Sequence, residues 1–292
     1  MSSLGIETRI AALARAESLP DSYPAMAMRW FAPLAEWLCR QREAVDECLV
    51  VGLNGAQGTG KTTLCKVLSL LVEDRGYRLL TLALDDFYLD QPGRKLLARM
   101  VHPLLRTRGV PGTHETDLLI GTLDTLRAGG SAMVPVFDKA IDDRLPANRW
   151  HREKPADIIV LEGWCVGVVP EEAGALVTPV NALEAAEDAE GSWRHYVNDA
   201  LAGEYAELFA SLDKLVMLQA PSLDCVLEWR RLQEAKLARQ REGDGVMDAA
   251  AVARFVQHYE RLTRHGLDTL PAQADYLLEV AEDHSIVGAG AR

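Results

Sequence analysis

Several features are scarce or missing in this sequence of 292 residues. No stretch approaches the roughly 18 uninterrupted apolar residues that a membrane-spanning helix needs, so no such helix is expected. The first residues lack a basic region followed by an apolar core, which argues against a secretory signal. The five cysteines are scattered and form no CxxC pair, so we expect reduced, mostly buried thiols in a cytoplasmic protein.

Basic residues are also in deficit. Lysine and arginine total 31 against 43 aspartates and glutamates, and the formal net charge is −12. Such a balance argues against nucleic acid or a membrane surface as a partner, although a small basic pocket remains compatible with it. The expected partner is therefore a small molecule, and the composition leaves the oligomeric state open.

What the sequence does contain is an alternation of short apolar runs and helical segments. The apolar runs predict buried strands over 49–53, 79–84, 158–161, 214–218 and 276–280. Helical spacing predicts helices over 62–73, 116–128, 195–211, 222–241 and 248–265. Strands that alternate with helices from 48 to 280 indicate an α/β protein with one mostly parallel, doubly wound sheet flanked by helices.

The remaining segments have a different character. Residues 1–46 are expected to form an N-terminal helical extension, bent or interrupted at Pro33, ahead of a main domain over 47–292. Residues 88–115 and the acidic stretch 170–193 are expected to be loops, and the charges of the second to form a solvated surface. Neither an internal repeat nor a flexible linker is visible, which favours a single large domain after residue 46.

The strongest motif follows the first apolar run, where residues 55–62 match the pattern GxxxxGK[ST] of a P-loop NTPase fold. In such a loop, successive backbone N–H groups surround a phosphate chain at the positive end of a helix dipole. Lys61 is expected to reach the β- and γ-phosphates of ATP, and Thr62 to offer its hydroxyl to Mg²⁺. The predicted nucleotide-binding residues are Gly55, Ala56, Gln57, Gly58, Thr59, Gly60, Lys61, Thr62 and Thr63.

Two acids end the second and third apolar runs. Asp85 follows the second run and Glu162 follows the third. Because ligands of an open α/β sheet bind beyond the carboxyl ends of its strands, both carboxylates should face the phosphate loop. Asp85 could accept a proton from an attacking hydroxyl, hold Mg²⁺, or do both, and Glu162 could hold the metal directly or through water. Together with Thr62 they form the predicted metal site, whereas Asp86 is more simply explained as part of a turn or cap.

Cationic side chains are concentrated in the long loops between the second and third runs. Loops over a rigid sheet usually carry substrate specificity, and arginine offers a planar fork that matches a carboxylate or phosphate. This concentration in an otherwise acidic chain suggests a small anionic acceptor. With Asp85, the predicted substrate-binding residues are Tyr88, His102, Arg106, Arg108, His114, Lys139 and Arg144.

A basic helical segment begins near Trp229 and is followed by a glycine-flanked turn. This pattern fits a closing lid over about 230–247, in which Arg230 neutralises charge on a transferred phosphoryl group. A helix kept soluble by its basic residues is the alternative. The next helix has apolar residues at packing positions, including Phe255 and Tyr259, and no chemistry is predicted for it.

These motifs together resemble the uridine kinase, phosphoribulokinase and pantothenate kinase group of P-loop kinases. The shared segments are 55–62, 84–88, 135–139 and 161–164. A narrower resemblance, to plant-type D-glycerate 3-kinases and their microbial relatives, is found at 108–114, 162–164, Trp193, 229–230, 233–234 and 255–259. It extends over residues 48–280.

The resemblance implies a five-stranded parallel core. It also implies an enzyme that transfers the γ-phosphoryl group of ATP to a hydroxyl of a small acid, of which D-glycerate is the first candidate. It assigns the general base to Asp85, a Mg²⁺-associated acid to Glu162 and the lid to the segment from Arg230 onward. Lys61 completes the predicted catalytic set.

Two alternatives remain open at this point. The family tends to show His-Asp where this chain has His114 and Glu115, which leaves room for another acceptor, as in uridine or pantothenate kinases. A nucleotide-dependent switch ATPase would use the same phosphate loop but would need no acceptor pocket. The long loops over 88–150 favour the kinase.

Overall fold

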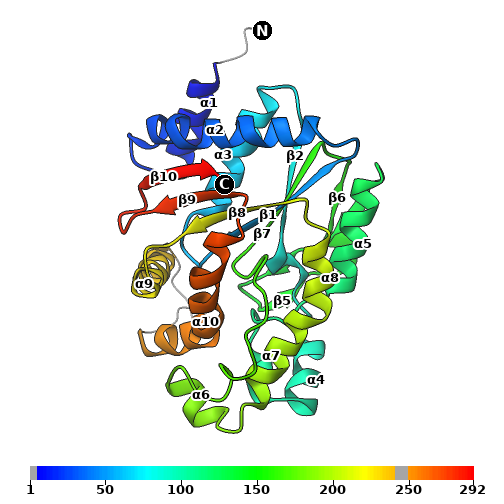
Figure 1. The fold of residues 1–292 in the computed structure, drawn as a ribbon, viewed down its shortest axis with the longest axis vertical. Coiled ribbons are helices and arrows are strands. Elements are labelled where there is room, and N and C mark those ends of the chain that lie inside the picture. The colour runs from blue at the N-terminus through cyan, green and yellow to red at the C-terminus, as the bar shows by residue number, and fades with distance from the viewer. Residues whose placement is uncertain (1–4, 241–248) are drawn as a thin grey trace.

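The computed structural model describes residues 5–240 and 249–292, arranged around a six-stranded sheet with the strand order β10-β9-β8-β1-β7-β2 (Figure 1). The strands are β1 (Leu49–Gly55), β2 (Leu79–Ala83), β7 (Ile158–Gly163), β8 (Lys214–Gln219), β9 (Tyr276–Val280) and β10 (Ile286–Ala291). The five strands from β2 to β9 in this order are parallel, and β10 runs antiparallel to β9. The predicted α/β class and its five parallel strands are confirmed, while β10 was not predicted.

Burial explains why the central strands are continuous apolar runs. Every residue of β1 and β7 is buried, because helices cover both faces of the sheet. Leu49, Val51 and Leu53 pack in one hydrophobic cluster with helices α2 (Tyr23–Glu43) and α3 (Lys61–Glu73). Val50 faces the opposite cluster with helices α5 (Thr116–Arg127), α7 (Ser192–Ala202) and α8 (Glu204–Ala210).

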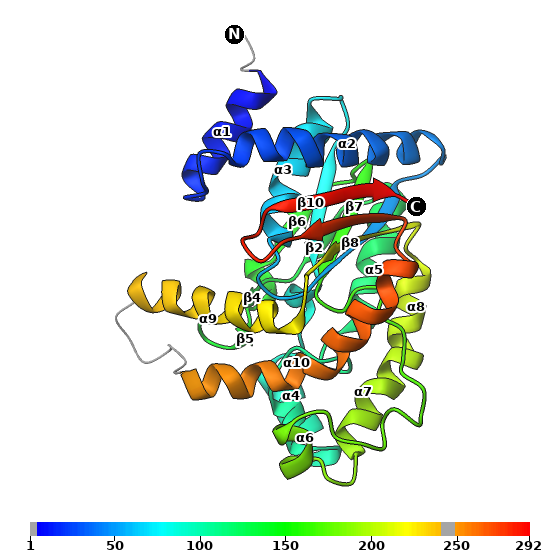
Figure 2. The same cartoon turned by 60° about the vertical axis from the view of Figure 1, so that its left-hand side comes forward.

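The N-terminal segment is helical, as the sequence predicts. Helix α1 (Ile6–Ala16) precedes α2, which continues through Pro33 rather than ending there. The two helices pack against α3, and α2 also contacts β10 (Figure 2). Ile10 and Leu34 are fully buried in the same cluster as β1, so the extension and the sheet share one core. The division at residue 46 stays a prediction.

The segment that follows β2 contains more regular structure than expected. The predicted loop 88–115 includes helix α4 (Gln91–Met100), which begins where the Asp90 carboxylate accepts the Gly93 N–H at 2.8 Å. A side-chain cap followed by a proline in the first turn is a sufficient start signal for a short helix, and the sequence reading missed it. Short turns of 3₁₀ helix lie at Leu84–Phe87, Pro103–Arg106, Ala147–Arg149 and Leu270–Ala272.

Two small antiparallel pairs lie beside the main sheet. Strand β3 (Ala132–Val134) pairs with β6 (His151–Glu153), and β4 (Phe137–Asp138) pairs with β5 (Asp143–Arg144). The β4–β5 hairpin holds Lys139, one of the predicted substrate-binding residues.

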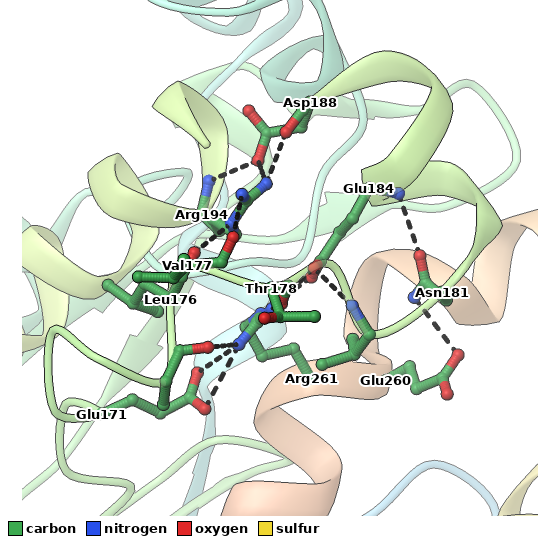
Figure 3. A network of polar contacts seen from close by, with 12 residues as sticks. Glu171, Leu176, Val177, Thr178, Asn181, Glu184, Asp188, Arg194, Glu260 and Arg261 are labelled. Carbon is green, nitrogen blue, oxygen red and sulfur yellow. Dashed lines mark hydrogen bonds and ion pairs between the residues drawn. The ribbon is translucent and has the colours of Figure 1, made fainter. Parts of the chain in front are cut away.

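The acidic stretch 170–193 is solvated only in part: Glu172, Glu187 and Glu190 are exposed, as the sequence interpretation expects, whereas two other acids are not. It includes helix α6 (Ala182–Glu187), and Glu184 and Asp188 are both buried (Figure 3). Arg261 Nη2 lies 2.7 Å from Glu184 Oε2, and Arg194 Nη1 lies 2.9 Å from Asp188 Oδ2. Buried carboxylates need such partners, and these fix the stretch to α7 and α10.

The last two helices, α9 (Leu223–Gln240) and α10 (Ala249–Thr269), contact each other and confirm the predicted helical segments (Figure 2). Part of the predicted lid, residues 241–247, lies outside the described residues. None of the helices in the described ranges has the length and hydropathy needed to cross a membrane.

Candidate active site

A large cleft opens where β1, β2 and β7 end, with a cavity volume of about 740 Å³. The parallel register places Leu53 of β1 beside Glu162 of β7, and Ala83 of β2 beside Glu162 on its other side. Because these strand ends meet at one edge, side chains from three distant segments reach one space. The predicted site residues that line the cleft are Gln57, Gly58, Gly60, Lys61, Thr62, Thr63, Asp85, Tyr88, Arg108, Lys139, Glu162 and Arg230.

The glycine loop joins β1 to α3 and forms one wall of the cleft. Gly60 adopts φ +94° directly before the first turn of α3, a conformation that a side chain would strain. Lys61 Nζ donates to the carbonyls of Gly55 at 2.6 Å and Ala56 at 3.2 Å. Gly55, Ala56 and Thr59 belong to the same loop but do not line the cleft, and the Thr59 hydroxyl donates to the Ala56 carbonyl at 2.8 Å. These contacts order the loop at the start of α3, which is where a phosphate loop binds a phosphate chain.

Lys61 is partly buried beside two carboxylates. Burial lowers the pKa of Lys61, and the negative charges of Glu162 and Asp85 oppose that shift. A cation held in this way is well placed to neutralise phosphate oxygens at the end of the loop.

Thr62 and Glu162 face each other across the start of α3. The Thr62 hydroxyl donates to Glu162 Oε1 at 3.0 Å, and Glu162 is only 9% exposed. Mg²⁺ prefers oxygen ligands and usually binds through one or two protein groups together with phosphates and water. A hydroxyl and a carboxylate directed at one point fit that preference.

Asp85 lies at the end of β2 and has two donors. Lys139 Nζ donates to Oδ2 at 2.7 Å, and the Tyr88 hydroxyl donates to Oδ1 at 2.6 Å. Burial would raise the pKa of Asp85, but the ion pair with Lys139 and the two hydrogen bonds lower it to about 2. Its neighbour Asp86 also lines the cleft and accepts the Phe137 N–H at 3.2 Å, a contact that joins the β4–β5 hairpin to the end of β2 rather than the local turn or cap that the sequence suggested.

Four of the predicted substrate-binding residues do not line the cleft. His114 is buried behind Tyr88, with ring centroids 4.5 Å apart, and its Nδ1 contacts the Tyr205 hydroxyl. His102 Nε2 lies 3.8 Å from the buried Asp188. Arg106 is exposed on the surface, and Arg144 Nη2 pairs with Glu115 at 2.7 Å. Three of these side chains, those of His102, His114 and Arg144, therefore make structural contacts that their positions in the sequence did not reveal.

The chain shows clear similarity to curated kinases. A Schizosaccharomyces pombe protein named as an uncharacterized kinase is 30% identical over 237 residues, covering 77% of this chain and 83% of that protein. The chloroplastic D-glycerate 3-kinase of Arabidopsis thaliana is 30% identical over 237 residues, covering 77% of this chain but 49% of that protein. The solved D-glycerate 3-kinase of Cryptococcus neoformans superposes with a TM-score of 0.72 at 27% identity, over 90% of this chain and 97% of that one.

The chain belongs to the P-loop kinases of the uridine and pantothenate kinase group. A search of protein-family models found no match. Pantothenate kinases also match, at 28% identity over 42% of this chain. This kinase is accordingly an ATP-dependent phosphotransferase whose acceptor is an alcohol group of a small molecule, and the predicted resemblance is confirmed.

Another part of the lining of the kinase cleft, the aromatic wall, consists of ring side chains that the sequence did not predict as site residues. They are Trp164, Trp229, Phe255, Tyr259 and His284. Phe255 and Tyr259 lie on α10, to which the sequence analysis assigned packing alone. Their i, i+4 spacing was visible, but nothing in it distinguishes a core face from a cleft wall.

Two of these aromatic residues connect the phosphate loop of the kinase to the β9–β10 turn. The rings of Trp229 and His284 are in tilted contact, with centroids 4.3 Å apart. His284 Nε2 lies 2.9 Å from the Gly58 carbonyl, and Trp229 Nε1 donates to the Glu282 carbonyl at 2.9 Å. Arg230, the next residue on α9, lies over the Phe255 ring at 5.1 Å and lines the cleft, where the lid prediction placed it.

Proposed function

We propose that this kinase transfers the γ-phosphoryl group of Mg²⁺-bound ATP to a hydroxyl of a small hydroxy acid, with D-glycerate as the first candidate. The supporting observation is that one cleft contains a phosphate loop, the Thr62–Glu162 oxygen pair, the carboxylate of Asp85 and the cations Arg108 and Lys139. The names of the Arabidopsis and Cryptococcus relatives favour D-glycerate among hydroxy acids.

On the donor side, the glycine loop would hold the phosphates and Lys61 would exchange its two carbonyl partners for phosphate oxygens. Thr62 and Glu162 would hold Mg²⁺, which when bound shields the charge of the β- and γ-phosphates. Glu162 fixes the direction of the Thr62 hydroxyl through their 3.0 Å hydrogen bond. The donor would therefore meet a preorganised set of oxygens and N–H groups.

On the acceptor side, Asp85 would orient the attacking hydroxyl and take its proton. With a pKa of about 2 this group is a carboxylate at any physiological pH, so it is always ready to accept a hydrogen bond. It is a weak base, which suits a loose phosphoryl-transfer transition state in which the proton leaves late. Tyr88 fixes the direction of the carboxylate through the 2.6 Å hydrogen bond to Oδ1.

The aromatic wall would exclude water from the reacting groups. Trp164 and Tyr259 are buried and meet edge to face with ring centroids 5.0 Å apart. A cleft with such a wall limits the access of water to the phosphoryl group, which would otherwise be hydrolysed. Arg230 on α9 would add positive charge near the phosphoryl group when the acceptor is bound.

The proposal is tested by measuring ADP release with a panel of acceptors: D-glycerate, pantothenate, uridine and ribulose 5-phosphate. We expect D-glycerate to stimulate ADP release, with one phosphorylated acid formed for each ADP. A strong response to another acceptor alone would contradict the glycerate assignment, and ATP consumption that ignores every acceptor would favour a switch ATPase.

The role of Asp85 is tested in the same assay with Asp85→Asn. We expect kcat to fall by about 10²–10⁴-fold, because a positioned acid–base group contributes about that much. Binding of a fluorescent ATP analogue should persist, because the phosphate loop is untouched. Full turnover by this variant would remove Asp85 from the role of base.

A further inference from the structure

Asp142, in the turn of the β4–β5 hairpin, sits between two arginines. Its Oδ2 lies 3.0 Å from Arg94 Nη1, and its Oδ1 accepts a hydrogen bond from Arg108 Nη1. Asp142 adopts φ +52°, a conformation that aspartate tolerates better than most residues. One carboxylate thus connects α4 to the loop that precedes His114.

Arg94 holds Asp142 from behind and is itself only 2% exposed. Its Nε donates to the Leu89 carbonyl at 3.2 Å and its Nη1 to the Arg106 carbonyl at 3.1 Å. Its Nη2 donates to the backbone carbonyl of Asp142 as well. A buried guanidinium needs a charge partner, so moving Asp142 away would leave Arg94 charged and uncompensated. Asp142 is therefore a fixed group rather than a mobile one.

Arg108 is the cleft-lining member of the trio and is fixed on several sides. Its guanidinium lies 5.4 Å from the centre of the Phe137 ring, and its backbone carbonyl accepts the Tyr259 hydroxyl at 2.9 Å. A guanidinium has five N–H donors in a planar fork, and Asp142 accepts from one nitrogen of it, Nη1. The Phe137 ring also contacts the ring of Tyr88, with centroids 5.1 Å apart. Phe137 therefore contacts both Arg108 and Tyr88, the hydrogen-bond partner of Asp85.

The other cationic side chains that line the cleft have different contacts and different assigned roles. Lys61 belongs to the phosphate loop, Lys139 pairs with Asp85 itself, and Arg230 lies over the Phe255 ring and is assigned above to the phosphoryl group. Arg108 instead has a partner that is held by a buried arginine outside the cleft lining. Its side chain is 20% exposed, which leaves part of the guanidinium open to a ligand.

We propose that Asp142 is a positioning residue, which holds the Arg108 guanidinium at the cleft wall as the binding site for the carboxylate of the acceptor. This inference rests on the proposed function and specifies its substrate class, a hydroxy acid whose carboxylate and reacting hydroxyl reach Arg108 and Asp85 at the same time. Asp142 touches neither reacting atom and acts through Arg108 alone.

The alternative hypothesis is that the Asp142 carboxylate occupies the place of the acceptor carboxylate and competes with it for Arg108. The two hypotheses predict changes of opposite sign. Removing a competitor would lower the KM for the acid, whereas removing a positioning group would raise that KM. The contacts of Arg94 favour positioning, because Asp142 could make way for a substrate only by leaving a buried charge unpaired.

The test compares Asp142→Asn with Asp143→Asn. Both variants remove one negative charge from the same hairpin, but Asp143 Oδ1 accepts the backbone N–H groups of Gln91 and Arg144, which an amide oxygen also accepts. We expect Asp142→Asn to raise the KM for the acid about tenfold, consistent with the loss of one charge-assisted hydrogen bond. The kcat and the KM for ATP should stay within about twofold, and Asp143→Asn should change none of the three.

A second variant keeps the test decisive if Asp142→Asn folds poorly. Arg108→Lys retains the charge but not the fork, and we expect it to raise the KM for the acid while the KM for ATP is unchanged. The double variant should show no further increase over Arg108→Lys. Additive effects, an unchanged KM or a lowered KM in Asp142→Asn would overturn the proposal. A wild-type enzyme that phosphorylates no acid would instead contradict the proposed function, so the two failures are distinguishable.

Discussion

The ammonium of Lys139 lies 2.7 Å from Asp85 Oδ2, and this contact joins the β4–β5 hairpin to the end of β2. It also sets the charge state of the residue to which we assign the role of base. Burial alone would raise the pKa of Asp85, so its value of about 2 depends on Lys139 and on the Tyr88 hydroxyl. The hairpin therefore controls both how strongly Asp85 attracts a proton and, through Asp142, where Arg108 lies.

Replacing Lys139 with Met should raise the pKa of Asp85, because the largest lowering influence is removed and burial remains. The acid limb of kcat/KM should then move to higher pH, since Asp85 is protonated and inactive over a wider range. The pH profile of kcat/KM measures this shift. Lys95→Met is the matched control, because Lys95 contacts Gln91 on the exposed side of α4. An acid limb at the same pH in Lys139→Met and wild type would disprove the coupling.

The Thr62–Glu162 pair leads to a prediction about metal dependence. Thr62→Val deletes the hydroxyl that Glu162 orients, and Glu162→Gln removes the charge that orients it. We expect each variant to need about tenfold or more Mg²⁺ for half-maximal activity, because groups in and around a metal site contribute about that much to its affinity. The measurement is a Mg²⁺ titration after treatment with a chelator, at saturating ATP. Thr62→Ser retains the hydroxyl and should behave as wild type, and an unchanged requirement in Thr62→Val would rule out this placement of the metal.

Much of the fold could be predicted because its strongest signals are local. Strands buried on both faces must be continuous apolar runs, which is why β1 and β7 were recognised directly. The glycine loop was recognised because its spacing follows from phosphate geometry. Asp85 and Glu162 were placed correctly at the cleft because strand ends in a parallel sheet share one edge.

The remainder depends on contacts between segments that are distant in the sequence. His114 and Arg108 are both polar residues in one long loop, yet the structure buries the first against Tyr205 and directs the second to the cleft. Only the packing of α8 and of the β4–β5 hairpin distinguishes them. Glu184 and Asp188 likewise looked solvated, because the arginines that neutralise them come from α7 and α10.

The phosphate loop should be sensitive to a methyl group at Gly58. A Cβ there would lie 2.8 Å from the Trp229 Cβ, and Gly58 adopts φ +82°. We expect Gly58→Ala to raise the KM for ATP at least tenfold, since either the phosphate loop or helix α9 must shift to relieve the clash with Trp229. Gly76→Ala is the matched control: Gly76 adopts φ +86° but a Cβ there would meet nothing within 4 Å. It should reduce stability by about 1 kcal/mol and leave the KM for ATP unchanged. A KM for ATP that Gly58→Ala leaves unchanged would show that the close approach of Trp229 does not constrain the phosphate loop.

His114 should make the stability of the fold depend on pH. Burial lowers the pKa of His114 from 6.5 to about 4, so the folded state keeps the ring neutral over a range in which the unfolded chain binds a proton. The unfolded state therefore binds more protons between these values, and the free energy of unfolding must fall as the pH drops from 6.5 towards 4. A shift of this size corresponds to a loss on the order of 3 kcal/mol. The loss is complete near pH 4 and absent above about pH 7.

Urea denaturation of wild type and His114→Asn at several pH values between 4 and 7.5 measures this contribution. The variant cannot take up the proton, so its free energy of unfolding should decline less steeply with falling pH, although removing the contact with Tyr205 lowers its stability at every pH. His195→Asn is the control, because His195 is exposed on α7 and meets solvent in the folded and unfolded states alike. If wild type and His114→Asn lost stability in parallel below pH 6.5, the burial of a neutral His114 would not be the cause.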